Sequence, residues 1–331
     1  MYPVHCSFQK SKGMEVIGID ISKDTFDVWR TSKGHNQFTN DKKGFKAFVK
    51  SLNEDDHCVM EATGCYHVQL ASFIYEAGIL ISVVNGLIIK RFIQMKMQRT
   101  KTDKSDAKMI CMFGQEQCPV GWEPEPEFIE ESKLRLTLVS MYIKQSTQLK
   151  NKIDNLNSGG ITRGIMISSL KRQLKRVTVE IGKLEQSVEQ LFKENAPQVL
   201  TNTMSIPGIG KKTALLILVT TNMFRDFSAP RQVVSYVGLA PVERKSGSSL
   251  RGRSYISKMG NPLLRNHLFM CSFTASKCNP QCKALYERIT AKGTSKKSAL
   301  VAVCGKLLKQ AFGVNKSGIP YDPTYVSRKA A

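Results

Sequence analysis

No apolar stretch in the 331 residues approaches the roughly 20 residues that a membrane-spanning helix needs, which excludes an integral membrane protein. The N-terminus also lacks the apolar segment of a secretory signal. The nine cysteines, an odd number with scattered spacing, favour reduced thiols over a disulfide framework. We therefore expect a soluble, cytoplasmic protein with no membrane partner.

Acidic residues are scarce: 27 Asp and Glu stand against 49 Lys and Arg, a net charge of +22. The excess is concentrated in residues 90–108, 133–183 and 243–309, which hold seven, eleven and fourteen basic residues and two acidic residues each. A protein that is merely basic would spread this charge evenly. Clustered cations instead predict several contact surfaces for a nucleic-acid backbone.

After a tail of residues 1–13, residues 14–120 alternate short apolar segments with amphipathic ones. Strands come first as a hairpin and then alternate with helices, which predicts a mixed α/β sheet with helices on both faces. The expected strands are 16–20, 26–29, 37–39, 57–61 and 79–84, and the expected helices are 43–52, 66–77 and 103–117.

Residues 121–132 are rich in proline and glutamate and are expected to form a linker. Residues 133–195 then show the spacing of a coiled coil. A regular seam consists of Leu170, Leu174, Val177, Ile181, Leu184, Val188 and Leu191. A less regular upstream set consists of Leu134, Leu138, Met141, Leu149, Ile153 and Leu156. The two helices would form a hairpin or pair with another subunit, so assembly is expected, although a seam closed within one chain stays open.

A mainly helical domain is expected over residues 200–322, before a tail of 323–331. It begins with a helix–hairpin–helix-like turn that contains Gly208 and Gly210 and is followed by Lys211 and Lys212. Such a turn lets backbone amides meet a phosphate without reading sequence. The alternative is an ordinary Pro-Gly turn.

Four carboxylates have the setting of a metal site: Asp20 and Glu61 at strand ends, and Asp103 with Asp106 on one helical face. Mg²⁺ prefers such oxygen ligands, and two ions can assist phosphoryl displacement. Lys101 and Lys104 would neutralise the phosphates. Each acidic residue alone also suits a capping role.

A loop at residues 243–253 places three serines among Arg244, Lys245, Arg251 and Arg253. A serine there could attack a phosphodiester if guanidinium groups offset the charge. No histidine lies nearby in sequence to act as a base, so a loop that only binds phosphate is the alternative. Lys258 extends the expected nucleic-acid surface.

His267, Cys271, Cys278 and Cys282 invite comparison with a zinc site, because each His/Cys or Cys/Cys pair is four residues apart. Structural zinc sites more often combine two tight pairs with supporting turns. Buried thiols are therefore the favoured interpretation.

Six motifs together resemble one family: IGIDISKDTFDV, EATGCY, KTDKSDAKM, SIPGIGKKTA, YVGLAPVERKSGSSLRGRSYISKMGNPLLR and FGVNKSGIPYD. The sequence resembles insertion-sequence transposases that join a RuvC-like DEDD domain to a C-terminal transposase domain. That family includes bridge-RNA-guided serine recombinases and related pilin-gene invertases.

The resemblance implies an RNase H-like (RuvC-like) fold for residues 14–120, with the DEDD set at Asp20, Glu61, Asp103 and Asp106. It also implies a catalytic serine at Ser246, although Ser248 and Ser249 are close enough to share that assignment. Mg²⁺ or Mn²⁺, double-stranded donor and target DNA, a noncoding guide RNA and a homo-oligomer in the bacterial cytosol are implied as well. The oligomer would be a dimer, and a tetramer in the synaptic complex.

The sequence thus predicts a transposase or site-specific recombinase that acts through a phosphoserine–DNA link. Three rivals remain: an invertase that reads DNA directly, a RuvC-like junction nuclease that uses water and ignores the serine, and a nucleic-acid-binding protein with structural carboxylates.

Overall fold

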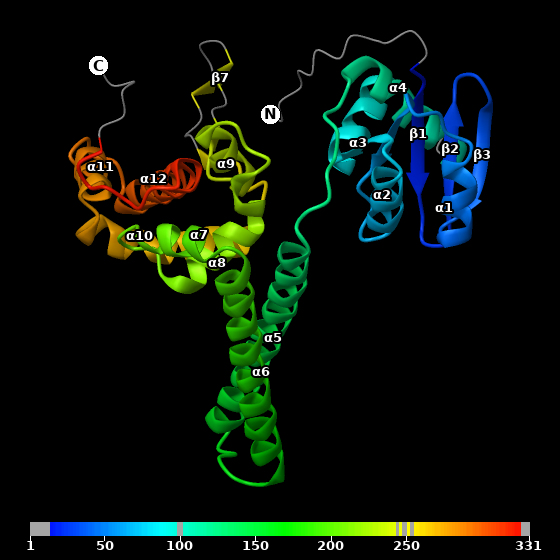
Figure 1. The fold of residues 1–331 in the computed structure, drawn as a ribbon. Helices are drawn as coiled ribbons and strands as arrows, with labels where there is room; N and C mark the ends of the chain where they lie inside the picture. The colour runs from blue at the N-terminus through cyan, green and yellow to red at the C-terminus, as the bar shows by residue number, and fades with distance from the viewer. Residues whose placement is uncertain (1–13, 98–101, 243–244, 247–249, 252–254, 326–331) are drawn as a thin grey trace. The chain divides into compact units, whose positions relative to one another are not determined.

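The computed structural model describes residues 14–97, 102–242, 245–246, 250–251 and 255–325 (Figure 1). Of residues 245–246 and 250–251 it describes the backbone alone. The chain divides into two compact units that meet in sequence at Pro124 and Glu125. Among the described residues, no helix is both long and apolar enough to cross a membrane.

The N-terminal unit is built on one five-stranded sheet in the order β3-β2-β1-β4-β5. Its strands are β1 (Val16–Ile21), β2 (Thr25–Arg30), β3 (Gly34–Thr39), β4 (His57–Glu61) and β5 (Leu80–Val84). The first three strands pair antiparallel, whereas β1, β4 and β5 run parallel. The predicted mixed sheet is therefore confirmed, and β3 begins three residues earlier than expected because it pairs with β2 over its full length.

Helices cover both faces of this sheet, as the alternation predicted. The helices are α1 (Lys42–Val49), α2 (His67–Glu76), α3 (Gly86–Met95) and α4 (Asp103–Gln117). One core joins β1, β2 and β4 to α1 and α2, where Phe26, Phe45 and Phe48 are fully buried. A second core joins the sheet to α3 and α4 through Phe92 and Phe113, whose rings meet edge to face.

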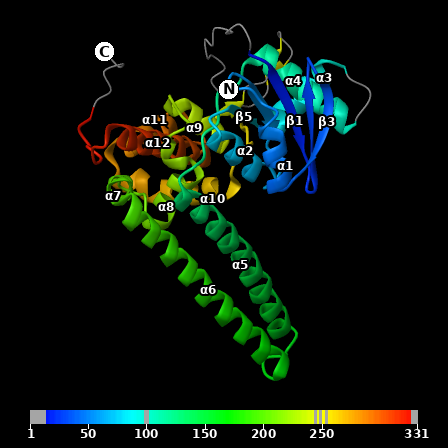
Figure 2. The ribbon, with the colours of Figure 1, turned by 45° about the vertical axis from the view of Figure 1, so that its right-hand side comes forward.

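The C-terminal unit begins with two long helices, α5 (Glu127–Ser158) and α6 (Ile165–Asn195), which lie side by side as a hairpin (Figures 1 and 2). The predicted α6 seam is confirmed, because all seven of its residues are buried or half-buried. The chain therefore closes this seam by itself, the alternative that the sequence left open.

The expected linker and the expected α5 seam both need correction. Residues 127–132 are helical: Pro126 precedes the first turn, where a backbone donor is not needed, and Glu127 and Glu130 in that turn suit the positive end of the helix. Of the expected α5 residues, four are buried or half-buried, as predicted: Leu138, Leu149, Ile153 and Leu156. The prediction is wrong at Leu134 and Met141, which are 68% and 52% exposed. The buried side also includes Ser132, Val139 and Ser146, which lead to Ile153 in steps of seven. Small serines suit a close helix approach, and Ser132 satisfies its hydroxyl by donating to Phe128 O.

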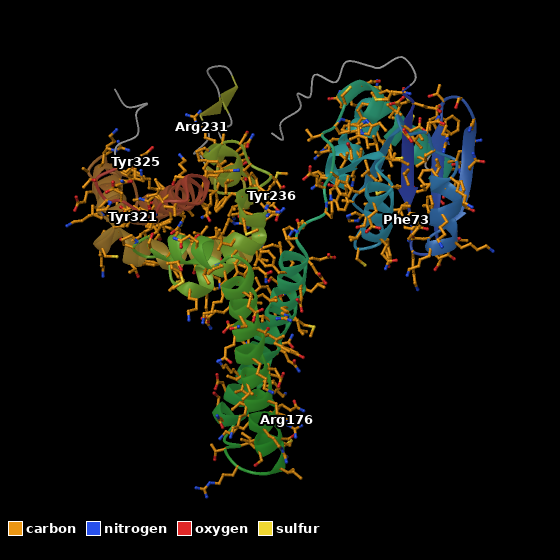
Figure 3. All side chains as sticks on the ribbon, in the orientation of Figure 1. Phe73, Arg176, Arg231, Tyr236, Tyr321 and Tyr325 are labelled. Atoms are coloured by element: carbon orange, nitrogen blue, oxygen red, sulfur yellow. The ribbon has the colours of Figure 1, made fainter. Side chains whose placement is uncertain are left out.

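The remaining helices pack around one apolar core. They are α7 (Pro197–Met204), α8 (Lys211–Thr220), α9 (Pro230–Val237), α10 (Pro262–Cys278), α11 (Pro280–Thr290) and α12 (Lys296–Ser317), with a 3-10 turn at Asn222–Phe224. Two short strand pairs interrupt them: β6 (Pro241–Val242) with β9 (Tyr255–Ile256), and β7 (Lys245–Ser246) with β8 (Leu250–Arg251). Tyr236 of α9, labelled in Figure 3, packs its ring against Phe227 at 5.2 Å.

Candidate active site and nucleic-acid surfaces

Two parallel strands carry carboxylates toward the same edge of the sheet. Asp20 is the fifth residue of β1, and Glu61 is the last residue of β4. Ile19 lies opposite Met60, so Asp20 and Glu61 follow at neighbouring positions. Open α/β sheets bind ligands at the carboxyl ends of their parallel strands, which makes this edge the candidate site.

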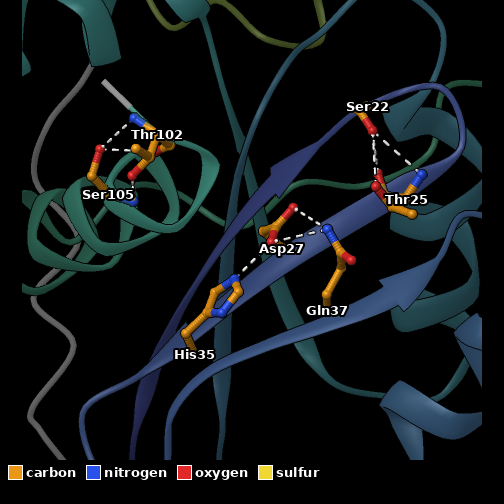
Figure 4. Close-up of polar contacts among 7 residues, drawn as sticks. All are labelled: Ser22, Thr25, Asp27, His35, Gln37, Thr102 and Ser105. Carbon is orange, nitrogen blue, oxygen red and sulfur yellow. Dashed lines mark hydrogen bonds and ion pairs between the residues drawn. The ribbon is translucent and has the colours of Figure 1, made fainter. Parts of the chain in front are cut away.

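The start of α4 places the second pair of carboxylates. The Ser105 amide donates to Thr102 Oγ1 at 3.2 Å, and the Thr102 amide donates to Ser105 Oγ at 3.0 Å (Figure 4). This reciprocal cap fixes the first helical turn. Asp103 and Asp106 lie three residues apart in that turn and so share one side of the helix.

Gly18 allows α4 to lie directly on β1. A Cβ at Gly18 would lie 2.2 Å from the carbonyl oxygen of Ala107 and 2.3 Å from the amide nitrogen of Cys111. Both are backbone atoms that cannot move aside, so only glycine permits this approach. Side chains alternate along a strand, and Asp20 therefore projects from the same face as Gly18, the face that α4 covers.

The electrostatics of Asp20 connect all four predicted carboxylates. Its pKa is raised to about 7, first by burial and then by the charges of Asp106, Glu61 and Asp103. Each of the other three residues therefore contributes a repulsive field at Asp20. A bound cation would relieve this repulsion.

Two lysines of α4 are ordered by an aromatic ring. Lys104 Nζ lies 5.9 Å from the ring centroid of Trp29, and Lys108 Nζ lies 5.4 Å from it. Trp29 is a β2 residue that the sequence did not mark as functional. Lys101, the other predicted contact here, lies outside the described residues.

The predicted phosphate-binding turn lies between α7 and α8. A Cβ at Gly208, where φ is +100°, would lie 2.7 Å from Cβ of Ala275. The close packing against α10 and the left-handed backbone therefore both favour glycine at this position. Lys211 and Lys212 pair with Glu189 and Glu185 of α6 at 2.9 and 2.6 Å. These two lysines are already partly neutralised, while Gly210 at the start of α8 has open space around it.

The predicted serine loop lies between β6 and β9. Within it, the backbone of Ser246 pairs with Leu250, and that of Lys245 pairs with Arg251. Arg244, Ser248, Ser249 and Arg253 lie outside the described residues. Lys258, just after β9, is exposed and has a left-handed backbone, with φ of 56°.

Comparisons with known proteins agree with both halves of the chain. Residues 200–287 match the family described as Transposase IS116/IS110/IS902, and residues 17–157 match the DEDD transposases of the IS110 type. The chain is 30% identical over 321 residues to a pilin gene-inverting protein of Moraxella bovis, covering 92% of this chain and 97% of that protein. The chain belongs to the IS110/IS116/IS902 transposase family.

Two further relatives extend the comparison. A transposase for insertion sequence element IS1111A from Coxiella burnetii is 26% identical over 290 residues, covering 78% of this chain and 76% of that protein. A transposase for IS1328 from Yersinia enterocolitica is 23% identical over 333 residues, covering 92% and 97%. The protein is therefore a DNA recombinase or transposase.

The DEDD transposase domain indicates dependence on a divalent metal, and the donor types fit one. The Glu61 carboxylate lies over Gly86, where a Cβ would be only 2.4 Å from Oε1. Glycine at the first residue of α3 thus leaves a cradle for this carboxylate. In the described part of the chain, no three acidic, His or Cys side chains already form a cluster that could hold an ion. The donors lie in one region without closing on one point, and the individual ligands stay a prediction.

A group of polar residues that the sequence reasoning missed adjoins the candidate site. Asp27 of β2 lies opposite Asp20 and is 5% exposed. His35 Nε2 lies 2.6 Å from Asp27 Oδ1, and Gln37 Nε2 donates to Asp27 Oδ2 at 3.3 Å (Figure 4). The signal was present in the alternation of β2 and β3, which puts these three polar residues on one face.

The zinc interpretation has no support among the described residues, where no metal-holding cluster is found. Cys271 Sγ contacts Thr213 Oγ1 at 3.3 Å, and Cys278 Sγ contacts Thr274 O at 3.1 Å. Cys282 is fully buried, and burial raises the pKa of its thiol to about 12. The expectation of buried thiols is therefore confirmed for Cys282, whereas Cys271 is half-buried and Cys278 is exposed.

Proposed function

We propose that this transposase cuts and rejoins double-stranded DNA through a covalent bond between Ser246 and a DNA phosphate. In the proposal, Asp20, Glu61, Asp103 and Asp106 hold Mg²⁺ or Mn²⁺. The metal part of the proposal rests on the neighbouring strand-end positions of Asp20 and Glu61 and on the close approach to β1 of α4, which carries Asp103 and Asp106. Burial and the charges of the other three carboxylates also raise the pKa of Asp20. Arrangements of this kind destabilise a fold and cluster at functional sites.

The fold supports an RNase H-like (RuvC-like) assignment for residues 14–120. A three-stranded antiparallel meander continues into two parallel strands, and the acidic residues stand at strand ends and on the covering helix α4. Residues 133–195 would serve as the coiled coil, and residues 200–322 as the transposase domain with the serine.

A bound divalent ion would polarise the phosphate and stabilise the charge that develops during displacement. The four carboxylates would hold the ion, and Lys104 would offset phosphate charge beside them. Ser246 Oγ attacks the phosphorus: the Oγ–P bond forms as the P–O3′ bond breaks. The serine proton passes to solvent, and the departing 3′ oxygen takes up a proton. Attack by another strand's 3′ hydroxyl reverses these steps, so rejoining needs no external energy source.

A noncoding RNA is proposed to pair with donor and target DNA, while basic protein surfaces hold the backbones. The three basic segments of the sequence support this division of labour. The alternative is an invertase that reads DNA directly, which the pilin gene-inverting relative favours. We further propose a homo-oligomer in the cytosol, in which the carboxylates of one subunit meet Ser246 of another.

The metal part is tested by cleavage of a plasmid that carries the gene's own flanking DNA. We expect Asp20→Asn to abolish strand cleavage in Mg²⁺, and EDTA to do the same to the wild type. Asp55→Asn is the matched control, because Asp55 is exposed and precedes β4, whereas Glu61 stands at the opposite end of that strand. Cleavage by Asp20→Asn at the wild-type rate would rule out this metal site.

The guide is tested by sequencing nucleic acid that co-purifies with the protein when it is expressed with its flanking DNA. One dominant structured RNA that maps beside the gene supports the guided reaction. If no RNA is enriched, the direct-reading invertase takes its place.

A further inference from the structure

A wide groove opens on the C-terminal unit. Of the residues predicted as sites above, only Lys258 lines it. It has a volume of about 1010 Å³ and is lined by α9, α11, α12 and the β6–β9 pair. Helix α12 lies against both α9 and α11 (Figure 1). All three helices contribute lining residues to the groove. The volume lies at the upper end of the range of about 300–1,000 Å³ for ligand pockets.

Small side chains make the groove hollow. Ala284 of α11 and Ala302 and Gly305 of α12 all line it. A Cβ at Gly305 would meet nothing closer than Val234 Cγ1 at 3.9 Å, so packing does not require glycine there. Glycine inside a helix costs about 1 kcal/mol relative to alanine. Glycine at this position therefore leaves an open space in the groove that a larger side chain would fill.

Cations surround this hollow. Lys258, Arg288, Lys297, Lys306 and Lys309 line the groove, and no Asp or Glu is among its described lining residues. None of the five forms an ion pair with another described residue, whereas Lys211 and Lys212 at the α7–α8 turn both do. Unpaired cations around one concave surface select a polyanion.

The floor of the groove is apolar, and this lining favours single-stranded over double-stranded nucleic acid. Leu239, Ile256, Leu285 and Val301 line the groove, together with the ring of Tyr255. A duplex offers phosphates, sugars and base edges to such a surface, but its base faces are covered by stacking. An unpaired strand also offers base faces, which bind apolar and aromatic side chains.

We propose that this groove binds a single-stranded stretch of nucleic acid, with bases on the apolar floor and phosphates along the five cations. Residues of β6 and β9, the strands that precede and follow the serine loop in the sequence, line the groove. This inference rests on the proposed function for its biological role, but the binding itself does not depend on cleavage.

The test measures binding of the full chain to fluorescein-labelled 12-nucleotide dT and U oligomers and to a 12-base-pair duplex, all in EDTA. Lys306→Gln with Lys309→Gln removes two groove cations, and Lys283→Gln with Lys292→Gln removes two cations of the same unit that do not line the groove. We expect the groove pair to weaken single-strand binding about tenfold and to flatten its salt slope by about 1.4, since each phosphate contact contributes roughly 0.7. The control pair should leave the slope unchanged.

The floor is tested without a change of charge. Gly305→Leu fills the hollow, and Gly313→Leu places the same side chain elsewhere on α12, where nothing lies within 4 Å. Both variants raise helix propensity, so both are expected to fold. Single-strand binding should fall about tenfold in Gly305→Leu and stay unchanged in Gly313→Leu, while duplex binding stays unchanged in both.

Three results would overturn the proposal: no loss in either groove variant, an equal loss for duplex and single strand, or an equal loss in the matched controls. A difference between the dT and U oligomers identifies which nucleic acid the groove prefers. Because the assay contains no divalent metal, it measures binding alone. A failure of the proposed cleavage mechanism therefore leaves these binding results unchanged. Asp20→Asn should bind the oligomers as the wild type does.

Discussion

Gly18 of β1 lies directly against the backbone of Ala107 in α4, with 2.2 Å between the position of a Cβ and the carbonyl oxygen. This approach holds α4, and with it Asp103 and Asp106, on the face of the sheet that carries Asp20. The arrangement of the acidic residues therefore depends on the absence of a side chain at Gly18.

Gly18→Val is expected to impair both stability and DNA cleavage. The new side chain would push α4 away from β1, and overpacking of this kind costs roughly 1–3 kcal/mol. Urea unfolding measures the loss of stability, and plasmid cleavage measures the effect on the site. As a control, Gly182→Ala in α6 has open space around it and should stabilise the helix by about 1 kcal/mol. A Gly18→Val protein with wild-type stability and cleavage would show that α4 does not depend on this contact.

Asp20→Asn is expected to stabilise the metal-free protein while it removes cleavage. The pKa of Asp20 is raised to about 7 from an ordinary value of 3.8. The folded state thus binds the Asp20 proton more tightly than the unfolded state does. Protonated Asp20 therefore contributes to the stability of the fold below about pH 4, and this contribution is lost as pH rises through about 7. At about pH 8 the charged carboxylate destabilises the fold, and asparagine does not.

Thermal unfolding in EDTA measures this effect. The midpoint should rise by several degrees at about pH 8 and much less at about pH 4, since about 1 kcal/mol shifts a domain of about 100 residues by roughly 4–8 °C. Asp55→Asn should show no such pH-dependent difference. Equal midpoints for wild type and Asp20→Asn at both pH values would contradict the repulsive environment.

Removal of His35 should destabilise the N-terminal unit. Asp27 is buried, and His35→Ala would leave Oδ1 with only the longer contact of 3.4 Å from Gln37. The loss of a buried partner costs about 1–3 kcal/mol, measurable by urea unfolding. Exposed Asn36→Ala on the same strand serves as the control. If His35→Ala unfolds at the same urea concentration as Asn36→Ala, the contact between His35 and Asp27 does not contribute to the stability of the fold.

The corrected α5 seam makes opposite predictions for two leucine-like residues. Ile153 is 7% exposed and Leu134 is 68% exposed. Ile153→Ala should therefore cost about 2 kcal/mol or more, whereas Leu134→Ala should change the free energy of unfolding by less than about 0.5 kcal/mol. Light scattering on both variants shows whether either change alters the oligomeric state. A larger stability loss in Leu134→Ala than in Ile153→Ala would show that Leu134 belongs to the seam after all.

Local sequence patterns predicted the sheet, the strand-end positions of Asp20 and Glu61, and the helical pair Asp103 and Asp106. They succeeded because alternation and helical spacing are properties of short segments. The Gly18 contact was not predicted, since a glycine within an apolar strand says nothing about which helix will lie on it. Ser132 and Ser146 were missed in the α5 seam because polar residues do not mark a hydrophobic stripe.

The groove on the C-terminal unit was beyond sequence reasoning for a related reason. Val234, Ala284 and Gly305 come from three different helices, α9, α11 and α12, and no local spacing pattern links them. Only their packing creates the hollow. The cations around it were visible as a basic segment, but their arrangement around one surface was not.

The most direct test of the central claim is a denaturing gel of labelled flanking DNA after incubation with the protein and Mg²⁺, with mass spectrometry of any protein–DNA adduct. We predict that the wild type forms a covalent adduct at Ser246. Ser246→Ala should form none while it still binds nucleic acid, and Ser248→Ala and Ser249→Ala should retain the adduct. Free DNA ends without an adduct, or an adduct that persists in Ser246→Ala, would contradict covalent recombination through this serine.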